Sequence, residues 1–226
     1  MCGLAGIYSH KPVATELYDS LIHLQHRGQD AAGITTYNKH MHKTKGMGLV
    51  RDIFTEKKIK RLKGNIGIAH TRYPTHGGFG HGEIQPFWTS VPYGIALAHN
   101  GNLTNYNELA KNITKKESRY LNTNSDTEVL LHLFAELLHY KNKHENDKQF
   151  FDCLCSALEN IYKNVQGAYS VVALVIGKGL VAFRDPQGIR PLVKGIRQNS
   201  NGKQDYIICL LYTSDAADER SSVDLG

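Results

Sequence analysis

The sequence predicts a layered α+β domain, and three observations support this fold class. Short apolar runs with β-strand character alternate with segments whose apolar residues recur at helical spacing. The expected strands form two groups, one within residues 2–101 and one within 168–209, with helices at about 104–164 between them. The 226 residues are ample for a buried core, in one large domain or two small ones. The spacing of apolar residues does not by itself order the layers.

The first group of strands surrounds one amphipathic helix. In the segment ATELYDSLIHLQ (14–25), Leu17, Leu21 and Leu24 are spaced four and three residues apart, which places them on one helical face. The strands of this group are expected at 2–8, 31–37, 42–50, 64–73 and 93–101, and the segments 31–37 and 42–50 are expected to pair.

Three helices and four strands complete the expected secondary structure. The helices are expected at about 104–112, 125–140 and 147–164, and the strands at 168–177, 180–185, 191–196 and 205–209. The helix at 125–140 begins with the pattern of a capping box, because Ser125 is a good N-cap residue and Glu128 follows three residues later.

Composition and charge exclude several classes of function. The net charge is +6, but the lysines and arginines are scattered as on solvated helix faces, so we expect no nucleic-acid partner. No apolar stretch reaches about 18 residues and the N-terminus lacks the features of a signal peptide, so we expect no membrane partner and a cytoplasmic location. The spacing of the four cysteines matches no zinc pattern, so we expect no metal site.

The segment 209–226 departs from the rest of the chain. Its sequence, CLLYTSDAADERSSVDLG, does not end as a domain would, and it resembles translated sequencing-adapter DNA. A natural polar tail is the alternative. We expect the folded domain to span 1–208 and to be incomplete at its C-terminal end, and we expect 209–226 to be a non-native tail.

Cys2 is a candidate nucleophile because of its position. Removal of the initiator methionine leaves a thiol and a free α-amino group on this one residue. The unperturbed pKa of an α-amino group is about 8, so the amine can accept the thiol proton near neutral pH without a histidine partner. The alternative is a small buried residue at the start of a strand.

Polar segments at the ends of expected strands carry further candidates. The side-chain amide of Asn100 and the backbone N–H of Gly101 can bind the oxyanion of a tetrahedral intermediate. Arg72 can pair with the α-carboxylate of glutamine, and Asp126, at a helix N-terminus, should stay ionised and pair with its α-ammonium group. These residues meet the needs of glutamine amide hydrolysis.

The same residues have structural alternatives. Arg72 can form a surface ion pair, Asn100 and Gly101 can form a simple hairpin turn, and Asp126 can support its own helix cap. His76 can be one of several solvated histidines, since the thiol already has a base.

These segments also carry a family resemblance. The start MCGLAGI, with LQHRGQDAAGI (24–34), TRYPTHG (71–77), AHNGNLTN (98–105), SDTE (125–128) and RDPQGIRPL (184–192), resembles the N-terminal glutaminase domain of the amidophosphoribosyltransferase family. The resemblance runs from Met1 to about Ile208. Other class II glutamine amidotransferases share the Cys-Gly start, but HRGQDAAGI and HNGNLTN together favour this family.

The resemblance implies a fold and a chemistry. The fold is the four-layer αββα sandwich of N-terminal-nucleophile (Ntn) hydrolases, with two stacked antiparallel sheets between helical layers. Cys2 would attack the side-chain amide of L-glutamine, form a thioester and release ammonia. Asn100 and Gly101 match the oxyanion hole of the family, and Arg72 and Asp126 match its clamps on the substrate.

The resemblance also implies roles for two neighbouring turns. Thr75 and His76 match a loop that closes over glutamine, and Arg27 and Gly28 match the turn that flanks the nucleophile. All four would therefore be substrate-binding residues.

The family's second domain is not found in this sequence. That domain uses the ammonia to convert phosphoribosyl pyrophosphate into 5-phosphoribosylamine, the first committed step of de novo purine biosynthesis. We therefore expect no cofactor in this fragment, Mg²⁺ only in the missing phosphoribosyltransferase domain, and a homo-oligomer at full length. The sequence leaves open an iron–sulfur cluster, a class II amidotransferase with a different ammonia acceptor, and a fragment that binds glutamine without catalysis.

Overall fold

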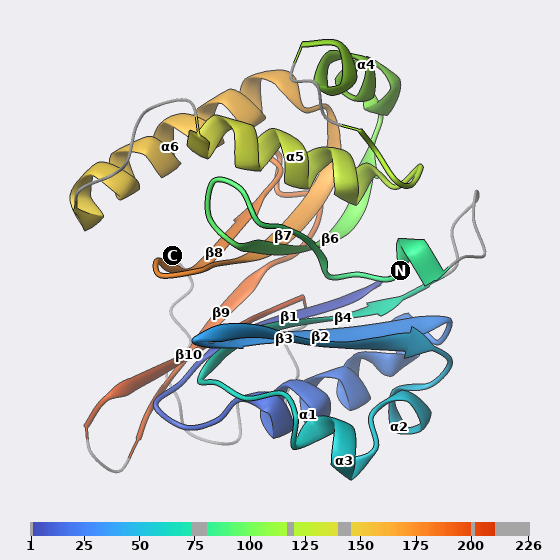
Figure 1. Cartoon of the computed structure of the whole chain (residues 1–226), viewed down its shortest axis with the longest axis vertical. Coiled ribbons are helices and arrows are strands. Elements are labelled where there is room, and N and C mark those ends of the chain that lie inside the picture. Colours follow the sequence, from blue (N-terminus) through green and yellow to red (C-terminus); the bar gives the residue numbers. More distant parts are fainter. Residues whose placement is uncertain (1, 74–80, 117–119, 140–145, 200–201, 211–226) are drawn as a thin grey trace.

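The computed structural model describes residues 2–73, 81–116, 120–139, 146–199 and 202–210. Two β-sheets lie face to face, and a layer of helices covers the outer face of each sheet, as Figure 1 shows. The expected four-layer αββα arrangement is therefore confirmed.

The first sheet contains the N-terminal strand near its centre. Its order is β3-β2-β4-β1-β10-β9, and all of its strand pairs are antiparallel. In chain order these strands are β1 (Gly3–Tyr8), β2 (Ala31–Asn38), β3 (His40–Met47), β4 (Ile66–Arg72), β9 (Val193–Gln198) and β10 (Gln204–Cys209). Because β1 lies between β4 and β10, Cys2, the residue before β1, lies near segments that are distant in the sequence.

The second sheet has four strands, again antiparallel, in the order β5-β6-β7-β8. They are β5 (Phe87–Thr89), β6 (Ile95–Leu103), β7 (Gly167–Val175) and β8 (Gly179–Arg184). Strands β6 and β7 pack against β1 and β4 of the first sheet. Small and branched apolar side chains fill the space between the sheets, among them Leu4, Ile68, Ala98 and Val172.

Helices complete the two outer layers. The first sheet is covered by α1 (Ala14–Leu24) with the short helices α2 (Val50–Ile53) and α3 (Glu56–Ile59). The second sheet is covered by α4 (Tyr106–Lys116), α5 (Asp126–His139) and α6 (Asp147–Asn164). The predicted face of α1 is confirmed, since Leu17, Leu21 and Leu24 are all buried.

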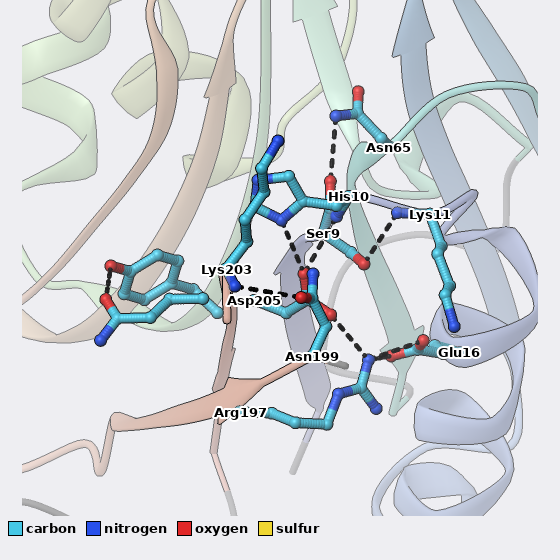
Figure 2. Close-up of polar contacts among 11 residues, drawn as sticks. Ser9, His10, Lys11, Glu16, Asn65, Arg197, Asn199, Lys203 and Asp205 are labelled. Atoms are coloured by element: carbon cyan, nitrogen blue, oxygen red, sulfur yellow. Dashed lines mark hydrogen bonds and ion pairs between the residues drawn. The ribbon is translucent and has the colours of Figure 1, made fainter. Parts of the chain in front are cut away.

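The hairpin of β9 and β10 is attached to the start of the chain by a polar network, drawn in Figure 2. The carboxylate of Asp205 accepts hydrogen bonds from the backbone N–H and the ring Nδ1 of His10, at 3.0 and 3.1 Å. It also pairs with Arg197, whose Nη2 in turn donates to Glu16 of α1 at 3.0 Å. The network joins two regions that are far apart in the sequence, the β9–β10 hairpin and the segment that runs from the loop after β1 into α1.

The structure shifts several expected strand boundaries by two or three residues and adds short elements. The strand expected over 42–50 lies at His40–Met47, and Gly48 follows it with a φ of +104°. That left-handed conformation ends the strand, and α2 begins two residues later. Strand β5 and helices α2 and α3 have no detectable pattern in the sequence, because elements of three or four residues are too short to show a period.

The structure describes only part of the C-terminal region for which a domain boundary at 208 and a non-native tail are expected. Strand β10 ends at Cys209, one residue beyond the expected boundary at 208, and Leu210 is buried. Residues 211–226, most of the expected non-native tail, lie outside the described residues. Among the helices that the structure describes, none is long and apolar enough to cross a membrane.

Candidate active site

Cys2 lies beside the end of β4. The two strands are antiparallel and Gly3 pairs with Thr71, so the start of β1 meets the last residues of β4. The backbone N–H of Gly3 donates to the Thr71 hydroxyl at 3.1 Å, and the N–H of Tyr73 donates to the Cys2 sulfur at 3.5 Å. Strand pairing thereby brings the N-terminal Cys-Gly pair next to the segment that contains Arg72.

The turn after α1 closes over the same point. Arg27 is the last residue of a short 3₁₀ helix (Gln25–Arg27), and its Nε donates to the Cys2 carbonyl at 3.1 Å. A Cβ atom at Gly28 would lie 2.6 Å from the carbonyl carbon of Arg72, so only glycine allows this close approach. Arg27 therefore contacts Cys2 directly, and Gly28 lies against the end of β4.

Arg72 ends β4 with its side chain almost fully buried between two carboxylates. Its Nη1 donates to Asp30 Oδ2 at 2.9 Å and its Nη2 donates to Glu83 Oε2 at 2.5 Å. The side chain is only 8% exposed, so the alternative of a surface ion pair does not describe it. The two carboxylates compensate the cost of burying the positively charged guanidinium.

Asn100 and Gly101 lie inside β6, so the alternative of a simple hairpin turn does not describe them. They pair with Ser170 and Tyr169 of β7, and the strand continues to Leu103. At Gly101 a Cβ atom would lie 2.0 Å from the Ala168 carbonyl oxygen, so glycine here permits close strand approach and not a turn. The Nδ2 atom of Asn100 is buried and has no hydrogen-bond partner among the described residues. A buried donor without a partner is a group that a ligand oxygen can satisfy.

Asp126 is the first residue of α5. Its Oδ2 accepts from the backbone N–H of Leu103 at 3.2 Å, and its Oδ1 lies 3.5 Å from His99 Nδ1. Burial by itself raises the pKa of this carboxyl, but His99 and the N–H groups of Leu103 and Thr127 outweigh burial and lower it. The expectation that Asp126 stays ionised agrees with this lowered pKa.

The pKa of the Cys2 thiol is shifted by burial and by the charges of Arg72 and Asp126. Burial raises its pKa above the ordinary thiol value, and the Tyr73 N–H opposes that effect. The positive charge of Arg72 also lowers the pKa of Cys2, while the negative charge of Asp126 raises it. Arg72 and Asp126 therefore lie close enough to act on the thiol, and the resting thiol is protonated near neutral pH.

The start of α5 is held by a carboxylate network centred on Glu128. Ser125 precedes the helix and accepts from the Thr127 N–H at 3.3 Å, as expected of an N-cap. The backbone N–H of Glu128 donates to the Ser125 carbonyl at 3.1 Å, whereas its carboxylate bonds the loop before Ser125. It accepts from Asn122 and from both the N–H and hydroxyl of Thr123, at 2.8 to 3.1 Å, and the Thr123 hydroxyl accepts from the Ser125 N–H.

Two predicted site residues are not described by the structure, and two residues beside Arg72 were not predicted. Thr75 and His76 lie outside the described residues. Asp30 and Glu83 were not predicted, although Asp30 belongs to the polar segment 24–34; Glu83 lies in a glycine-rich stretch without a periodic pattern. Within the described ranges no group of three or more His, Cys, Asp or Glu side chains is arranged to hold a metal ion.

Comparison with known proteins gives a family match. A model of the glutamine amidotransferase domain family matches residues 78–203. The amidophosphoribosyltransferase of Pasteurella multocida is 47% identical over 209 residues, which cover 92% of this chain and 41% of the relative. The amidophosphoribosyltransferase of Saccharomyces cerevisiae is 46% identical over 214 residues, with the same shares covered. The chain thus spans about two fifths of the length of these relatives.

A solved structure agrees with the fold. The glutamine phosphoribosylpyrophosphate amidotransferase from B. subtilis, complexed with ADP and GMP, superposes with a TM-score of 0.76 at 30% identity. The match covers 99% of this chain and 44% of that protein.

Proposed function

The chain belongs to the glutamine amidotransferase domain family, and we propose that it hydrolyses the side-chain amide of glutamine through a thioester at Cys2. The proposal is supported most by one observation. Pairing of β1 with β4 places Cys2 beside the end of β4, where the N–H of Tyr73, the residue after Arg72, donates to the Cys2 sulfur at 3.5 Å. The charges of Arg72 and Asp126 shift the pKa of this thiol in opposite directions. A nucleophile flanked by one cation and one anion suits a zwitterionic amino-acid substrate.

The first chemical step uses the amine of Cys2 as its base. After removal of Met1, the α-amino group takes the thiol proton and the sulfur bonds to the amide carbon of the substrate. The carbonyl oxygen becomes an oxyanion, which accepts hydrogen bonds from Asn100 Nδ2 and the Gly101 N–H. The C–N bond then breaks, and the proton held by the amine passes to the leaving nitrogen, which departs as ammonia.

The second step returns the enzyme to its starting state. Water attacks the thioester carbon, the same donors stabilise the second oxyanion, and the C–S bond breaks. The products are glutamate and the free Cys2 thiol, so one glutamine and one water give one glutamate and one ammonia.

Substrate binding is assigned to the charged groups around the thiol. Arg72 pairs with the α-carboxylate of glutamine and Asp126 with its α-ammonium group, which orients the side-chain amide toward Cys2. The family resemblance assigns substrate binding to Thr75 and His76 as well, and Arg27 contacts the nucleophile through the Cys2 carbonyl. The lowered pKa of Asp126 supports its part, because only the ionised carboxylate binds an ammonium group.

For the whole protein we propose the activity of its relatives, amidophosphoribosyltransferase. The ammonia would then serve to make 5-phosphoribosylamine from phosphoribosyl pyrophosphate, in a phosphoribosyltransferase domain beyond this chain. Mg²⁺ in that domain, a homo-oligomer and a cytoplasmic location stay predictions. The identity of 46 to 47% over most of the chain supports this acceptor over that of another class II amidotransferase.

The decisive experiment combines glutaminase assay and mass spectrometry. The chain with Met1 removed should release glutamate from glutamine and should take up one glutamine-analogue electrophile, at Cys2. Cys2→Ser and a form that retains Met1 should do neither. Full glutaminase activity in either variant would contradict the mechanism, and absence of labelling in the processed chain would favour a fragment without catalysis.

A further inference from the structure

Arg72 already has two carboxylate partners in the site without substrate. Asp30 Oδ2 lies 2.9 Å from Nη1 and Glu83 Oε2 lies 2.5 Å from Nη2. The three side chains are 8 to 19% exposed, so water screens their charges poorly. The cluster of one guanidinium and two carboxylates carries a net charge of −1 when all three groups are ionised.

A third carboxylate at this cluster is unfavourable. The α-carboxylate of glutamine would add a further negative charge beside Asp30 and Glu83, where like charges repel strongly at low exposure. If Arg72 is to bind that carboxylate, one of its present partners must leave it. The geometry shows which partner can do so.

Asp30 is fixed by its backbone. Its N–H donates to the Arg72 carbonyl at 3.1 Å and its carbonyl accepts from the Gly48 N–H at 2.8 Å. The next residue, Ala31, pairs with Arg72 in the β2–β4 ladder. Between this fixed backbone and its carboxylate Asp30 has one rotatable bond fewer than Glu83, so its carboxylate has less freedom to leave the guanidinium.

Glu83 is placed differently. It is the last residue of a one-turn 3₁₀ helix (His81–Glu83) outside both sheets, and its carboxylate reaches Arg72 on a side chain that is one methylene longer. The following residue, Ile84, is fully buried and its carbonyl accepts from Lys45 at 3.0 Å, which holds the backbone in place. Rotation of the Glu83 side chain alone can thus release Arg72 without moving a strand.

We propose that Glu83 is an internal competitor of the substrate, occupying Arg72 in the empty site and yielding it to the α-carboxylate of glutamine. The inference rests on the proposed role of Arg72 in binding that carboxylate. In the empty site Glu83 helps to neutralise a buried guanidinium, which is costly to leave without partners. In the occupied site the substrate carboxylate takes over the same task. Glu83 therefore lowers the affinity for ligands that bind Arg72 through an α-carboxylate.

The test compares two alkylating reagents on the 226-residue chain with Met1 removed. A glutamine-analogue electrophile carries an α-carboxylate, whereas iodoacetamide has none. Glu83→Gln keeps the size of the side chain but removes its charge. We expect this variant to lower the half-saturating concentration of the analogue about 3- to 10-fold. The reason is that the apparent affinity of a ligand is reduced in proportion to the fraction of sites in which Arg72 is available, and Glu83 occupies Arg72 in most of the empty sites. The rate of iodoacetamide labelling corrects for any change in the thiol or in the folded fraction.

Asp30→Asn is the matched control, since it removes the other negative charge from the same guanidinium. It should raise the half-saturating concentration, because Asp30 orients Arg72 in both states. An equal or higher value for Glu83→Gln than for the parent chain, after the iodoacetamide correction, would overturn the competitor role. Absence of saturable labelling in the parent chain and in both variants would instead overturn the proposed function, and with it this inference.

Discussion

At the scale of single residues, the site combines a protonated thiol with an unpartnered amide donor. Burial raises the pKa of Cys2, so the thiol needs a base at the moment of reaction, a role that the proposed mechanism gives to the α-amino group of the same residue. Asn100 Nδ2 is buried without a hydrogen-bond partner among the described residues. A buried donor without a partner destabilises the empty protein, and it gains a hydrogen bond when an oxyanion forms. An interaction made only in the transition state is what catalysis by differential binding requires.

Asn100→Ala tests the oxyanion donor. We expect kcat for glutamine hydrolysis to fall about 10²- to 10³-fold, with a much smaller change in KM, because the donor acts on charge that develops in the transition state. The unfolding midpoint should change little, since the deleted Nδ2 makes no hydrogen bond within the described part of the chain. Asn102→Ala, in the same strand with an exposed side chain, is the control and should keep parental kinetics. A loss of less than tenfold in Asn100→Ala would remove Asn100 from the oxyanion hole.

At the scale of elements, helix α5 presents Asp126 because its first turn is anchored from outside the helix. Glu128 is buried and accepts five hydrogen bonds from Asn122 and Thr123. Burial raises the pKa of this carboxyl, and these bonds outweigh burial and lower it. The loop before the helix is therefore bonded to the third residue of the helix, and Asp126 lies between the loop and Glu128.

Glu128→Gln tests this anchor. The amide replaces one acceptor oxygen by a donor that faces the N–H groups of Asn122 and Thr123, so we expect the free energy of unfolding to fall by about 2 kcal/mol. Because Asp126 loses its support, the half-saturating concentration of the glutamine-analogue electrophile should also rise. Glu108→Gln is a matched control, since Glu108 is also the third residue of its helix, α4, but is exposed. Equal effects of the two substitutions, by urea denaturation and labelling, would argue against the anchor.

At the scale of the whole molecule, contacts between distant segments close the first sheet. The β9–β10 hairpin adds to β1, and Asp205 fastens it to the loop after β1 and, through Arg197, to α1 (Figure 2). Burial by itself raises the pKa of Asp205, but hydrogen bonds from His10, Arg197 and Ser9 lower it from 3.8 to about 2. A carboxyl whose pKa is lowered in the folded state stabilises the fold fully above its unfolded pKa, and this contribution is lost as the pH falls toward the folded value.

Asp205→Asn tests that contribution. At pH 7 we expect the free energy of unfolding to fall by about 1–3 kcal/mol, the range for hydrogen bonds to a charged group. The difference from the parent chain should shrink between about pH 4 and pH 2, because the parental carboxyl becomes protonated there. Urea denaturation at a series of pH values measures both effects. Glu56→Gln, which removes an exposed i,i+4 pair with Lys60, should cost less than about 1 kcal/mol at any pH. A constant difference across the pH range would contradict the assigned cause.

The sequence by itself determined most of the elements and the chemical parts of the site. Apolar periodicity located α1, α5 and α6 and nearly all long strands, because a helix or strand that buries one face must repeat its apolar residues at a fixed spacing. The residue types at Cys2, Arg72, Asn100 and Asp126 predicted an amide-cleaving site, because amide hydrolysis requires a nucleophile, oxyanion donors and charges for the substrate.

Only the tertiary structure decided how these parts meet. Antiparallel pairing of β1 with β4 brings Cys2 beside Arg72, and long pairing with β7 makes Asn100 and Gly101 part of a strand although the dipeptide is typical of a turn. The partners of Arg72 could not be predicted from the sequence either, because no local pattern around Asp30 or Glu83 indicates contact with Arg72. The physical reason is that local spacing reports which face of an element is buried, whereas the contacts of a buried charge depend on chain segments brought together by folding.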